Sequence, residues 1–350
     1  MIKLLITNST GTVDVTQFVQ SITWSGDYQQ CSRTLDFEII SSPTDKNLPA
    51  IKCELGNSVI LMQDTMILFD GYIFERQKDT NSSTINITCY DRGIYLKRNE
   101  ASYKFKNTTP AAIAKRICTD FGIQLGSIVA PNVKVSRNFI GVSLYSMIQT
   151  AYTLASEATD KKYLMRFTGS KLNIIEKAVT NETLVIEGGS NLMSASTTES
   201  ISNMVNQVVI YNDKDKLIST QKDSEAIKLY GVLQSYLKQA KGENGIAKAK
   251  KLIADNGVSQ KITIENLGNI ANITGGTVVV REPYTGVYGL FYIDSDTHTW
   301  KRGQYYNKLV VNFKNIMDEQ DVGALPNKDG SKTKSSTSGN WDYTHKPGGK

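Results

Sequence analysis

Side chains that build metal centres are scarce in this sequence, which has two histidines and four cysteines among 350 residues. No two cysteines have the CxxC spacing, and two histidines are too few for a zinc finger, so these sites are excluded. Cys89 alternates in phase with Ile85 and Ile87, and Cys118 adjoins Ile117 on an apolar helical surface. We expect buried, reduced thiols in a protein made in the cytosol. The cysteines are Cys31, Cys53, Cys89 and Cys118.

Long apolar runs are also missing. No stretch approaches the roughly 18 apolar residues that a membrane span requires, so we expect no such span. The N-terminal segment MIKLLITNSTG has only a short apolar run and lacks a small-residue cleavage site. We interpret it as a first strand and expect no signal peptide.

Positive charge is in excess but is not gathered in one folded region. The net charge is +6, and residues 328–350 hold five lysines and two aspartates, which is half of the excess. A protein that binds nucleic acid usually concentrates its charge on one face or stripe. We therefore expect no direct recognition of nucleic acid.

Catalytic motifs are absent from the sequence. It contains no GxSxG elbow, no HExxH pair and no glycine-rich phosphate loop. His298 lies between Thr297 and Thr299 in an expected strand, and we interpret it as a structural histidine satisfied by hydrogen bonds. His345 lies in a polar C-terminal tail, and we assign it no catalytic role either.

Two pairs of carboxylates have the spacing that places both side chains on one face of a strand, as a glycosidase could use. We interpret them as the polar face of exposed strands. The pairs are Asp294 with Asp296 and Asp36 with Glu38. Asp213 and Asp215 indicate a turn that lacks the full calcium-binding spacing. We assign no catalytic, cofactor-binding or metal-binding residue, and we expect no enzyme activity and no cofactor.

A β pattern appears twice in the chain, at residues 68–93 and, loosely, at residues 289–313. Each copy has a glycine before an aromatic-rich strand, then a polar turn, then a second strand that alternates apolar and polar residues. This period of two predicts antiparallel strands. Two such units in one polypeptide suggest two related β barrels.

The fold class expected from the whole sequence is α+β, mainly β, with two antiparallel β-barrel domains. Residues 1–98 would form the first barrel, and residues 99–188 an α/β middle domain of two helices and a hairpin. Residues 189–321 would form the second barrel with a helical insertion at 223–257. Residues 322–350 have too few apolar side chains to fold alone and predict a flexible basic tail. Trp341 and Tyr343 give this tail either a docking motif or simply two aromatic residues in a solubilising end.

Helix signals support the middle domain and the insertion. Thr109 precedes Pro110 as an N-cap, and Gly122 occupies the expected C-terminal cap. A second helix is expected after Ser143, and a hairpin turns at residues 168–171. In the insertion, apolar spacing predicts a helix over 224–239 and a shorter one over 246–254.

The order of these modules resembles the baseplate hub proteins of contractile phage tails, above all those of Gram-positive prophages and phage-tail-like bacteriocins (tailocins), which are related to the hub part of type VI secretion spike proteins. The resemblance rests on four groups of residues. They are Phe69-Asp70-Gly71-Tyr72-Ile73 with Cys89-Tyr90-Asp91-Arg92 and Leu96; Thr109-Pro110 with Ile113, Ile117 and Gly122; Ser224-Glu225 with Leu229-Tyr230-Gly231 and Gln234; and Tyr292-Ile293 with His298, Gly303-Gln304-Tyr305 and Leu309-Val310-Val311.

This resemblance implies a structural role in a virion or tail-like particle. Three chains, each with two tube-like barrels, would form a homotrimeric ring that adapts a hexameric tail tube to a trimeric central spike. The implied partners are the tail tube protein, the central spike protein and baseplate wedge or sheath-proximal proteins. Assembly in the bacterial cytoplasm and release by lysis would follow.

Two alternatives remain open at this level. One is a tail-associated enzyme that degrades peptidoglycan, and the other is a tail-tip protein of a non-contractile phage. The first would require a carboxylate pair in an active site, and the second would lack neighbouring genes for sheath proteins.

Overall fold

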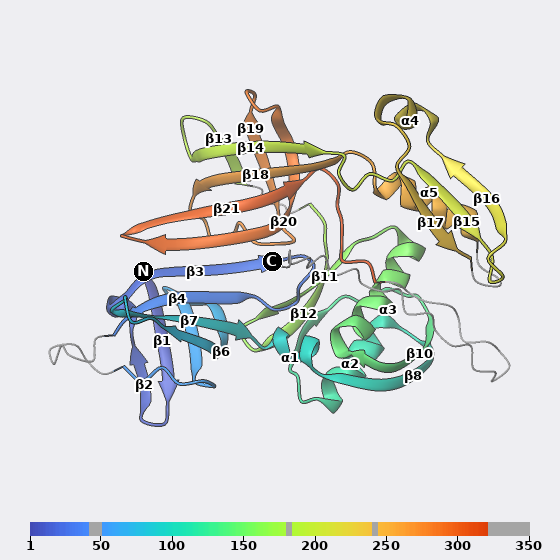
Figure 1. The fold of residues 1–350 in the computed structure, drawn as a ribbon. Coiled ribbons are helices and arrows are strands. Elements are labelled where there is room, and N and C mark those ends of the chain that lie inside the picture. Colours follow the sequence, from blue (N-terminus) through green and yellow to red (C-terminus); the bar gives the residue numbers. More distant parts are fainter. Residues whose placement is uncertain (42–50, 180–183, 240–243, 321–350) are drawn as a thin grey trace, which may run out of the picture.

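The computed structural model describes residues 1–41, 51–179, 184–239 and 244–320. The expected tail at 322–350, with Trp341, Tyr343 and His345, lies outside these residues. The fold is mainly β and belongs to the α+β class, as the sequence predicts. Its strands group into a first β half, a second β half and an insertion, and a middle module of helices and strands lies between the two halves along the chain (Figure 1).

The first β half consists of seven strands and a short 3₁₀ turn. They are β1 (Ile2–Asn8), β2 (Gly11–Asp14), η1 (Thr16–Phe18), β3 (Val19–Asp27), β4 (Thr34–Ile40), β5 (Ser58–Gln63), β6 (Met66–Lys78) and β7 (Thr84–Asp91). Apolar and polar residues alternate along these strands, so that each strand buries one face. In β4 the buried residues are Leu35, Phe37 and Ile39. Together with Leu4, Leu61, Phe69 and Ile87 they fill one apolar core.

The second β half contains six strands. They are β13 (Leu184–Glu187), β14 (Leu192–Ser200), β18 (Ser259–Leu267), β19 (Thr277–Glu282), β20 (Val287–Lys301) and β21 (Gln304–Asn312). Its core includes Ile262, Val280, Phe291 and Leu309. The hairpins expected from the repeated pattern are both present, as β6–β7 and β20–β21.

The two halves repeat one strand order. Hydrogen-bonded neighbours in the first half run β3-β4-β7-β6-β5, and in the second half they run β14-β18-β21-β20-β19, with the same order along the chain. The next neighbour differs, because β1 pairs antiparallel with β5 whereas β13 pairs parallel with β19. The repeat of five antiparallel strands supports the internal duplication inferred from the sequence.

The halves are not separate sheets. β3 of the first half pairs with β20 of the second, so that the described strands form one 13-stranded sheet. In Figure 1 the order β14, β18, β21, β20, β3, β4 and β7 can be followed from top to bottom. The sequence predicted two barrels but did not predict the strand pairing that joins them.

The middle module contains three helices and five strands. They are α1 (Gly93–Arg98), β8 (Glu100–Thr108), α2 (Pro110–Asp120), β9 (Leu125–Ile128), β10 (Val135–Ser143), α3 (Leu144–Thr159), β11 (Tyr163–Thr168) and β12 (Lys171–Glu176). Thr109 and Ser143 cap α2 and α3 as expected, and β11–β12 is the expected hairpin. The β8–β10 pair and β9 were not predicted.

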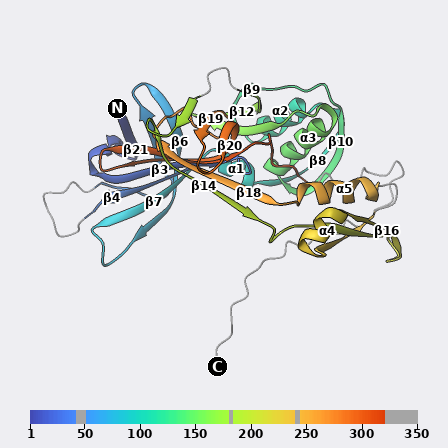
Figure 2. The same cartoon turned by 90° about the horizontal axis from the view of Figure 1, so that it is seen from above.

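The insertion lies between β14 and β18. It comprises β15 (Gln207–Tyr211), β16 (Leu217–Lys222), α4 (Ser224–Tyr230), β17 (Gln234–Lys238) and α5 (Gly245–Asp255). The prediction of one helix over 224–239 is wrong, because Gly231 ends α4 and β17 then pairs parallel with β15. The insertion is thus a three-stranded sheet with two helices, and it begins before residue 223. Figures 1 and 2 place α5 and β16 on the side of the molecule away from β4 and β7.

Candidate functional site

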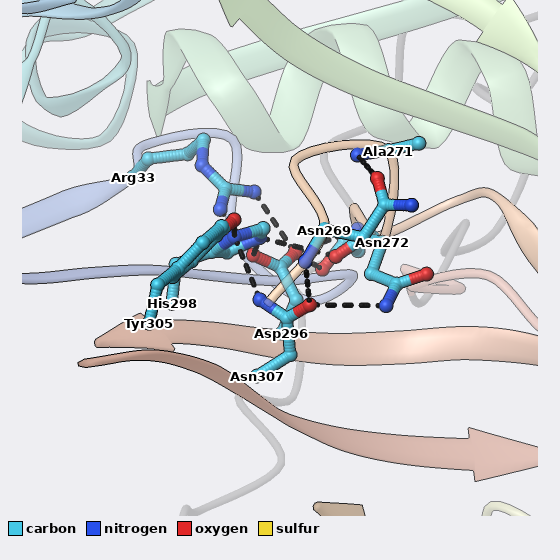
Figure 3. A network of polar contacts seen from close by, with 9 residues as sticks. Arg33, Asn269, Ala271, Asn272, Asp296, His298, Tyr305 and Asn307 are labelled. Atoms are coloured by element: carbon cyan, nitrogen blue, oxygen red, sulfur yellow. Dashed lines mark hydrogen bonds and ion pairs between the residues drawn. The ribbon is translucent and has the colours of Figure 1, made fainter. Parts of the chain in front are cut away.

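The strand pair that joins the two β halves carries an extensive buried polar network. β3 and β20 run antiparallel, from Asp27 opposite Ser295 to Ser21 opposite Lys301. Polar side chains from β20, β21 and two loops meet on the buried side of this pair (Figure 3). We call this network the junction.

An ion pair crosses the junction from one half to the other. Arg33, just before β4, donates from Nη1 to Asp296 Oδ1 at 3.0 Å and from Nη2 to Oδ2. The guanidinium also lies over the Trp24 ring, 3.9 Å from its centroid. Because both charges are almost fully buried, their mutual contact compensates the loss of hydration that each suffers.

Asp296 has further donors that fix its ionised form. The Thr274 backbone N and hydroxyl both donate to Oδ1 at 2.6 Å. Burial alone would raise the pKa of Asp296, but the Arg33 charge and the contact with His298 hold it well below its usual range. Asp296 is therefore a buried carboxylate that remains charged at neutral pH.

His298 is completely buried beside Asp296 and is satisfied by hydrogen bonds, as the sequence predicted. The Tyr305 hydroxyl lies 2.8 Å and Asn307 Nδ2 lies 2.9 Å from His298 Nδ1. Since an amide nitrogen can only donate, Nδ1 accepts and the ring proton belongs on Nε2. Nε2 lies 3.1 Å from Asp296 Oδ2 and 3.1 Å from the Asn272 carbonyl oxygen.

Asn307 links His298 to the loop between β18 and β19. Its Oδ1 accepts hydrogen bonds from the backbone N of Asn269 at 2.7 Å and from Asn272 Nδ2 at 3.0 Å. The backbone donor fixes which atom of the amide is oxygen. This chain of contacts holds the loop against β21 and leaves the ring of His298 in one orientation.

A second buried ion pair connects the middle module to the second half. Lys177 Nζ lies 3.5 Å from Asp294 Oδ1 and donates to the Ile316 carbonyl at 2.7 Å. Burial raises the pKa of Asp294 to about 6, although Lys177 opposes this shift. Burial likewise lowers the pKa of Lys177. The bond to Ile316 shows that this pair also anchors the chain after β21.

The segment after β21 packs on helix α3. The Tyr145 hydroxyl donates to Asp318 Oδ2 at 2.7 Å, and Gln149 donates to the Asp318 carbonyl. The backbone N of Gln320 donates to the Thr153 hydroxyl at 3.2 Å. These contacts fix the middle module to the end of the second half, so three parts of the chain meet around the junction.

The carboxylate pairs weighed as catalytic candidates do not form an open acid–base site. Asp294 and Asp296 are buried and each is engaged by a cation, which contradicts our interpretation of them as exposed. Asp36 and Glu38 are half-buried and accept hydrogen bonds from Thr88 and Thr84. Asp213 and Asp215 lie in the turn between β15 and β16, as expected.

The sequence predicted no metal site and no membrane span anywhere in the chain, and the structure bears on the described residues. Within them, no cluster of three or more histidine, cysteine, aspartate or glutamate side chains is arranged to hold a metal ion. No helix in the same part of the chain is long and apolar enough to cross a membrane. The four cysteines are free and buried, as predicted.

Several junction residues were not recognisable from the sequence. Arg33 stands in a short loop, and its partner Asp296 is 263 residues away. Asn272 and Asn307 have no local pattern that distinguishes them from surface asparagines. The scarcity of histidine was the only signal, and it led to His298 alone.

The fold is similar to that of several phage tail proteins. The 43 kDa tail protein of prophage MuSo2 from Shewanella oneidensis is similar, with a TM-score of 0.68 and 16% identity; the match covers 89% of this chain and 98% of that one. A tail protein from Neisseria meningitidis MC58 has a TM-score of 0.61 and 15% identity, over 89% of this chain and 96% of its own.

The chain belongs to the YQBQ-like family, whose model matches residues 22–312. It is 25% identical over 329 residues to protein XkdQ of the phage-like element PBSX of Bacillus subtilis (strain 168), and the match covers 91% of this chain and 99% of that protein. A component of the Escherichia coli type VI secretion system, described as structurally similar to the T4 tail proteins gp27 and gp5, has a TM-score of 0.53 and 11% identity over 88% of this chain and 76% of its own. This protein is therefore similar to structural proteins of phage tails and baseplates.

Proposed function

We propose that this protein is the structural baseplate hub of a contractile tail or tail-like particle. Three chains form a ring that adapts a hexameric tail tube to a trimeric central spike. The observation that carries the proposal is the repeated strand order β3-β4-β7-β6-β5 and β14-β18-β21-β20-β19, joined in one sheet. Two similar modules per chain give six modules in a trimer, and six modules match a sixfold partner.

The domain division follows the same reasoning. The division expected from the sequence, 1–98, 99–188 and 189–321, shifts by a few residues, because Leu96 of α1 packs in the core of the middle module and β13 pairs with β19. The two tube-like domains are therefore residues 1–92 and 184–320, and the middle domain lies between them. The ring binds the tail tube on its sixfold face, the spike on its threefold face and wedge or sheath-proximal proteins at its periphery. It assembles in the bacterial cytoplasm and leaves the cell by lysis.

A non-enzymatic role is part of the proposal. The carboxylates with the spacing of a catalytic pair, Asp294 and Asp296, are buried and bound by Lys177 and Arg33, so a glycan has no access to them. Zymography on peptidoglycan should show no clearing by the purified chain. Clearing that is lost in D294N or D296N, in preparations that circular dichroism shows to be folded, would favour the peptidoglycan-degrading alternative.

The mass of the purified full chain in solution tests the ring. Mass photometry should detect a species of about 116 kDa, three times the chain mass of 38.7 kDa. Addition of the particle's tail tube or spike protein should shift this species further. A chain that stays monomeric and binds neither partner would overturn the proposed function.

A further inference from the structure

One strand edge of the second half is long and has no partner within the described part of the chain. β14 pairs with β18 on one side only, and its nine residues, LMSASTTES, carry a single charged side chain, Glu199. Natural proteins usually keep exposed edges short or heavily charged, since a bare edge pairs with other chains. The opposite edge strand, β2, is only four residues long. The length and composition of β14 therefore favour a covered edge.

The internal repeat identifies which strand β14 corresponds to. β14 occupies the place of β3, and both contain the same irregularity in pairing. In β3 the register shifts between Val19 and Ser21, and in β14 it shifts between Leu192 and Ser194. Bulges are specific features of a strand, so this agreement fixes the correspondence to the residue.

β3 pairs with β20, and the equivalent of β20 in the first half is β6. The register shift after Ile73 in β6 matches the shift after Ile293 in β20. Gly56 N donates to the Ile73 carbonyl at 2.8 Å, just as Gly275 N donates to the Ile293 carbonyl at 3.0 Å. The stretch of β20 that pairs with β3, residues 295–301, therefore corresponds to residues 75–81, of which 75–78 belong to β6 and are exposed.

We propose that β14 of one chain pairs antiparallel with residues 75–78 of β6 in a second copy of this chain, repeating between chains the β3–β20 pairing within the chain. The proposal rests on the trimeric ring of the proposed function and specifies its interface. Transfer of the β3–β20 register gives four facing pairs. They are Glu75 with Ser200, Arg76 with Glu199, Gln77 with Thr198, and Lys78 with Thr197.

The charges across this interface are complementary with reversed sign. Within the chain, Asp296 lies opposite Gly26, and Arg33 passes over the glycine, where a Cβ would lie 2.2 Å from its Nη1. Between chains, Arg76 replaces Asp296 and Glu199 replaces Gly26. Glu199, which lies on the strand itself, would thus neutralise Arg76 as the neighbouring Arg33 neutralises Asp296 within the chain. Opposite charges on facing strands attract.

An apolar contact adjoins the charged pair. Within the chain, the backbone N of Tyr28 donates to the Asp294 carbonyl at 2.9 Å, next to the strand pairing. The equivalent residues are Ile201 and Phe74, whose side chains are 38% and 39% exposed. Pairing of β14 with β6 brings these two apolar side chains together and removes both from water.

The interface is head-to-tail, because it joins the second half of one chain to the first half of the next. Such an interface builds a closed ring when the rotation between copies divides a full turn. The β3–β20 pairing within each chain would alternate with the β14–β6 pairing between chains, so three copies place six modules around one axis. These two strand pairings are enough to close the ring.

Cysteine crosslinking of the full chain tests the register. Gln77 and Thr198 face each other and are exposed, so a Q77C/T198C variant should form disulfide-linked dimers and trimers that a reductant separates. The native cysteines are buried and should not interfere. Q77C/S194C, which moves the second cysteine along β14, is the matched control and should crosslink at least about tenfold more slowly, because the thiols lie outside disulfide range.

The outcomes separate this proposal from the proposed function. A trimer that does not crosslink through Q77C/T198C, or crosslinks equally through Q77C/S194C, overturns the β14–β6 pairing and leaves the trimeric hub intact. A chain that forms no trimer overturns both. Crosslinked trimers support both.

Charge exchange provides a second measurement. In R76E, a glutamate would face Glu199, and these like charges repel. The trimer should therefore be half dissociated at a concentration about tenfold or more higher than in the wild type. R76E/E199R should restore most of the trimer affinity, whereas K171E, at the exposed first residue of β12, should have no effect. A trimer unaffected by R76E, or not rescued by E199R, overturns the assigned charge pair.

Discussion

Arg33 and Asp296 are the two residues on which the junction depends most. Each is a buried charge that would be unfavourable alone, and each is stabilised mainly by the other. Thr274, His298 and Trp24 add contacts that hold the pair in one geometry. The pair therefore selects one way of joining the halves, since any other register leaves two charges buried without partners.

Removal of one charge of this pair should be more harmful than removal of both. D296N leaves the Arg33 guanidinium buried without a counter-ion and should lower the free energy of unfolding by about 3–5 kcal/mol. R33M/D296L removes both charges and should cost less than D296N alone. Urea unfolding followed by circular dichroism measures both values.

The exposed pair Lys161–Glu176 offers a matched control. Its side chains are 53% and 34% exposed, so E176Q should change stability by less than about 1 kcal/mol. Equal losses for D296N and E176Q would contradict the role given to the junction ion pair.

The buried carboxylates of β20 should give opposite pH dependences. Asp294 has a pKa raised to about 6, above its unfolded value, so its contribution is full at low pH and is lost as pH rises from about 4 to 6. Asp296 has a lowered pKa, so its contribution is present above about pH 4 and is lost as pH falls.

Comparison of variants with the wild type isolates these two contributions. Between pH 4 and 6, the stability of the wild type relative to D294N should fall as pH rises. Relative to D296N, the wild type should instead lose stability when the pH falls below about 4. Urea titrations at several pH values measure both trends, and the same sign for the two variants would refute the assignment.

At the scale of elements, the insertion is a unit with its own small core. Val208, Ile210 and Ala249 pack together, with Leu237 and Leu252 against them. One exposed ion pair, from Lys251 to Glu319, links it to the segment after β21 at 2.7 Å. The equivalent connection in the first half, between β3 and β4, is only six residues long. The two β halves therefore need no insertion to form their sheet.

Deletion of residues 202–257 should leave both halves folded. β14 and β18 pair as far as Ser200 opposite Ser259, so an Asn-Gly turn can close them as a hairpin. The shortened chain should keep hydrogen-exchange protection of β20 amides close to that of the full chain. Loss of protection in β20 would show that the insertion supports the second half.

Elements differed in how well the sequence revealed them. Helices α2 and α3 were predicted correctly because Thr109 and Ser143 cap them and long apolar repeats follow. β17 was mistaken for helix because Tyr236 and Leu237 continue an apolar spacing that either structure can have. Its strand conformation comes from parallel pairing with β15, and the left-handed φ of 77° at Gly231 was the local sign of the break.

At the scale of the whole molecule, the sequence predicted two β units and a module between them. It could not predict that β3 and β20 would pair, since no local sequence pattern specifies which strand, hundreds of residues away, pairs with a given strand edge. The same limit explains why the junction was missed except for His298. Burial of Asp294 and Asp296 follows from that long-range pairing, and no local pattern distinguishes them from exposed aspartates.

The β3–β20 pairing also sets an order of events during synthesis. β3 leaves the ribosome long before β20, so the first half must wait with an open edge until nearly the whole chain has been made. During that interval the edge can accept β20 from a neighbouring nascent chain, which would exchange halves between polypeptides. Slow translation or crowded polysomes should therefore favour intertwined assemblies, and an early stop codon before β20 should yield an aggregating fragment.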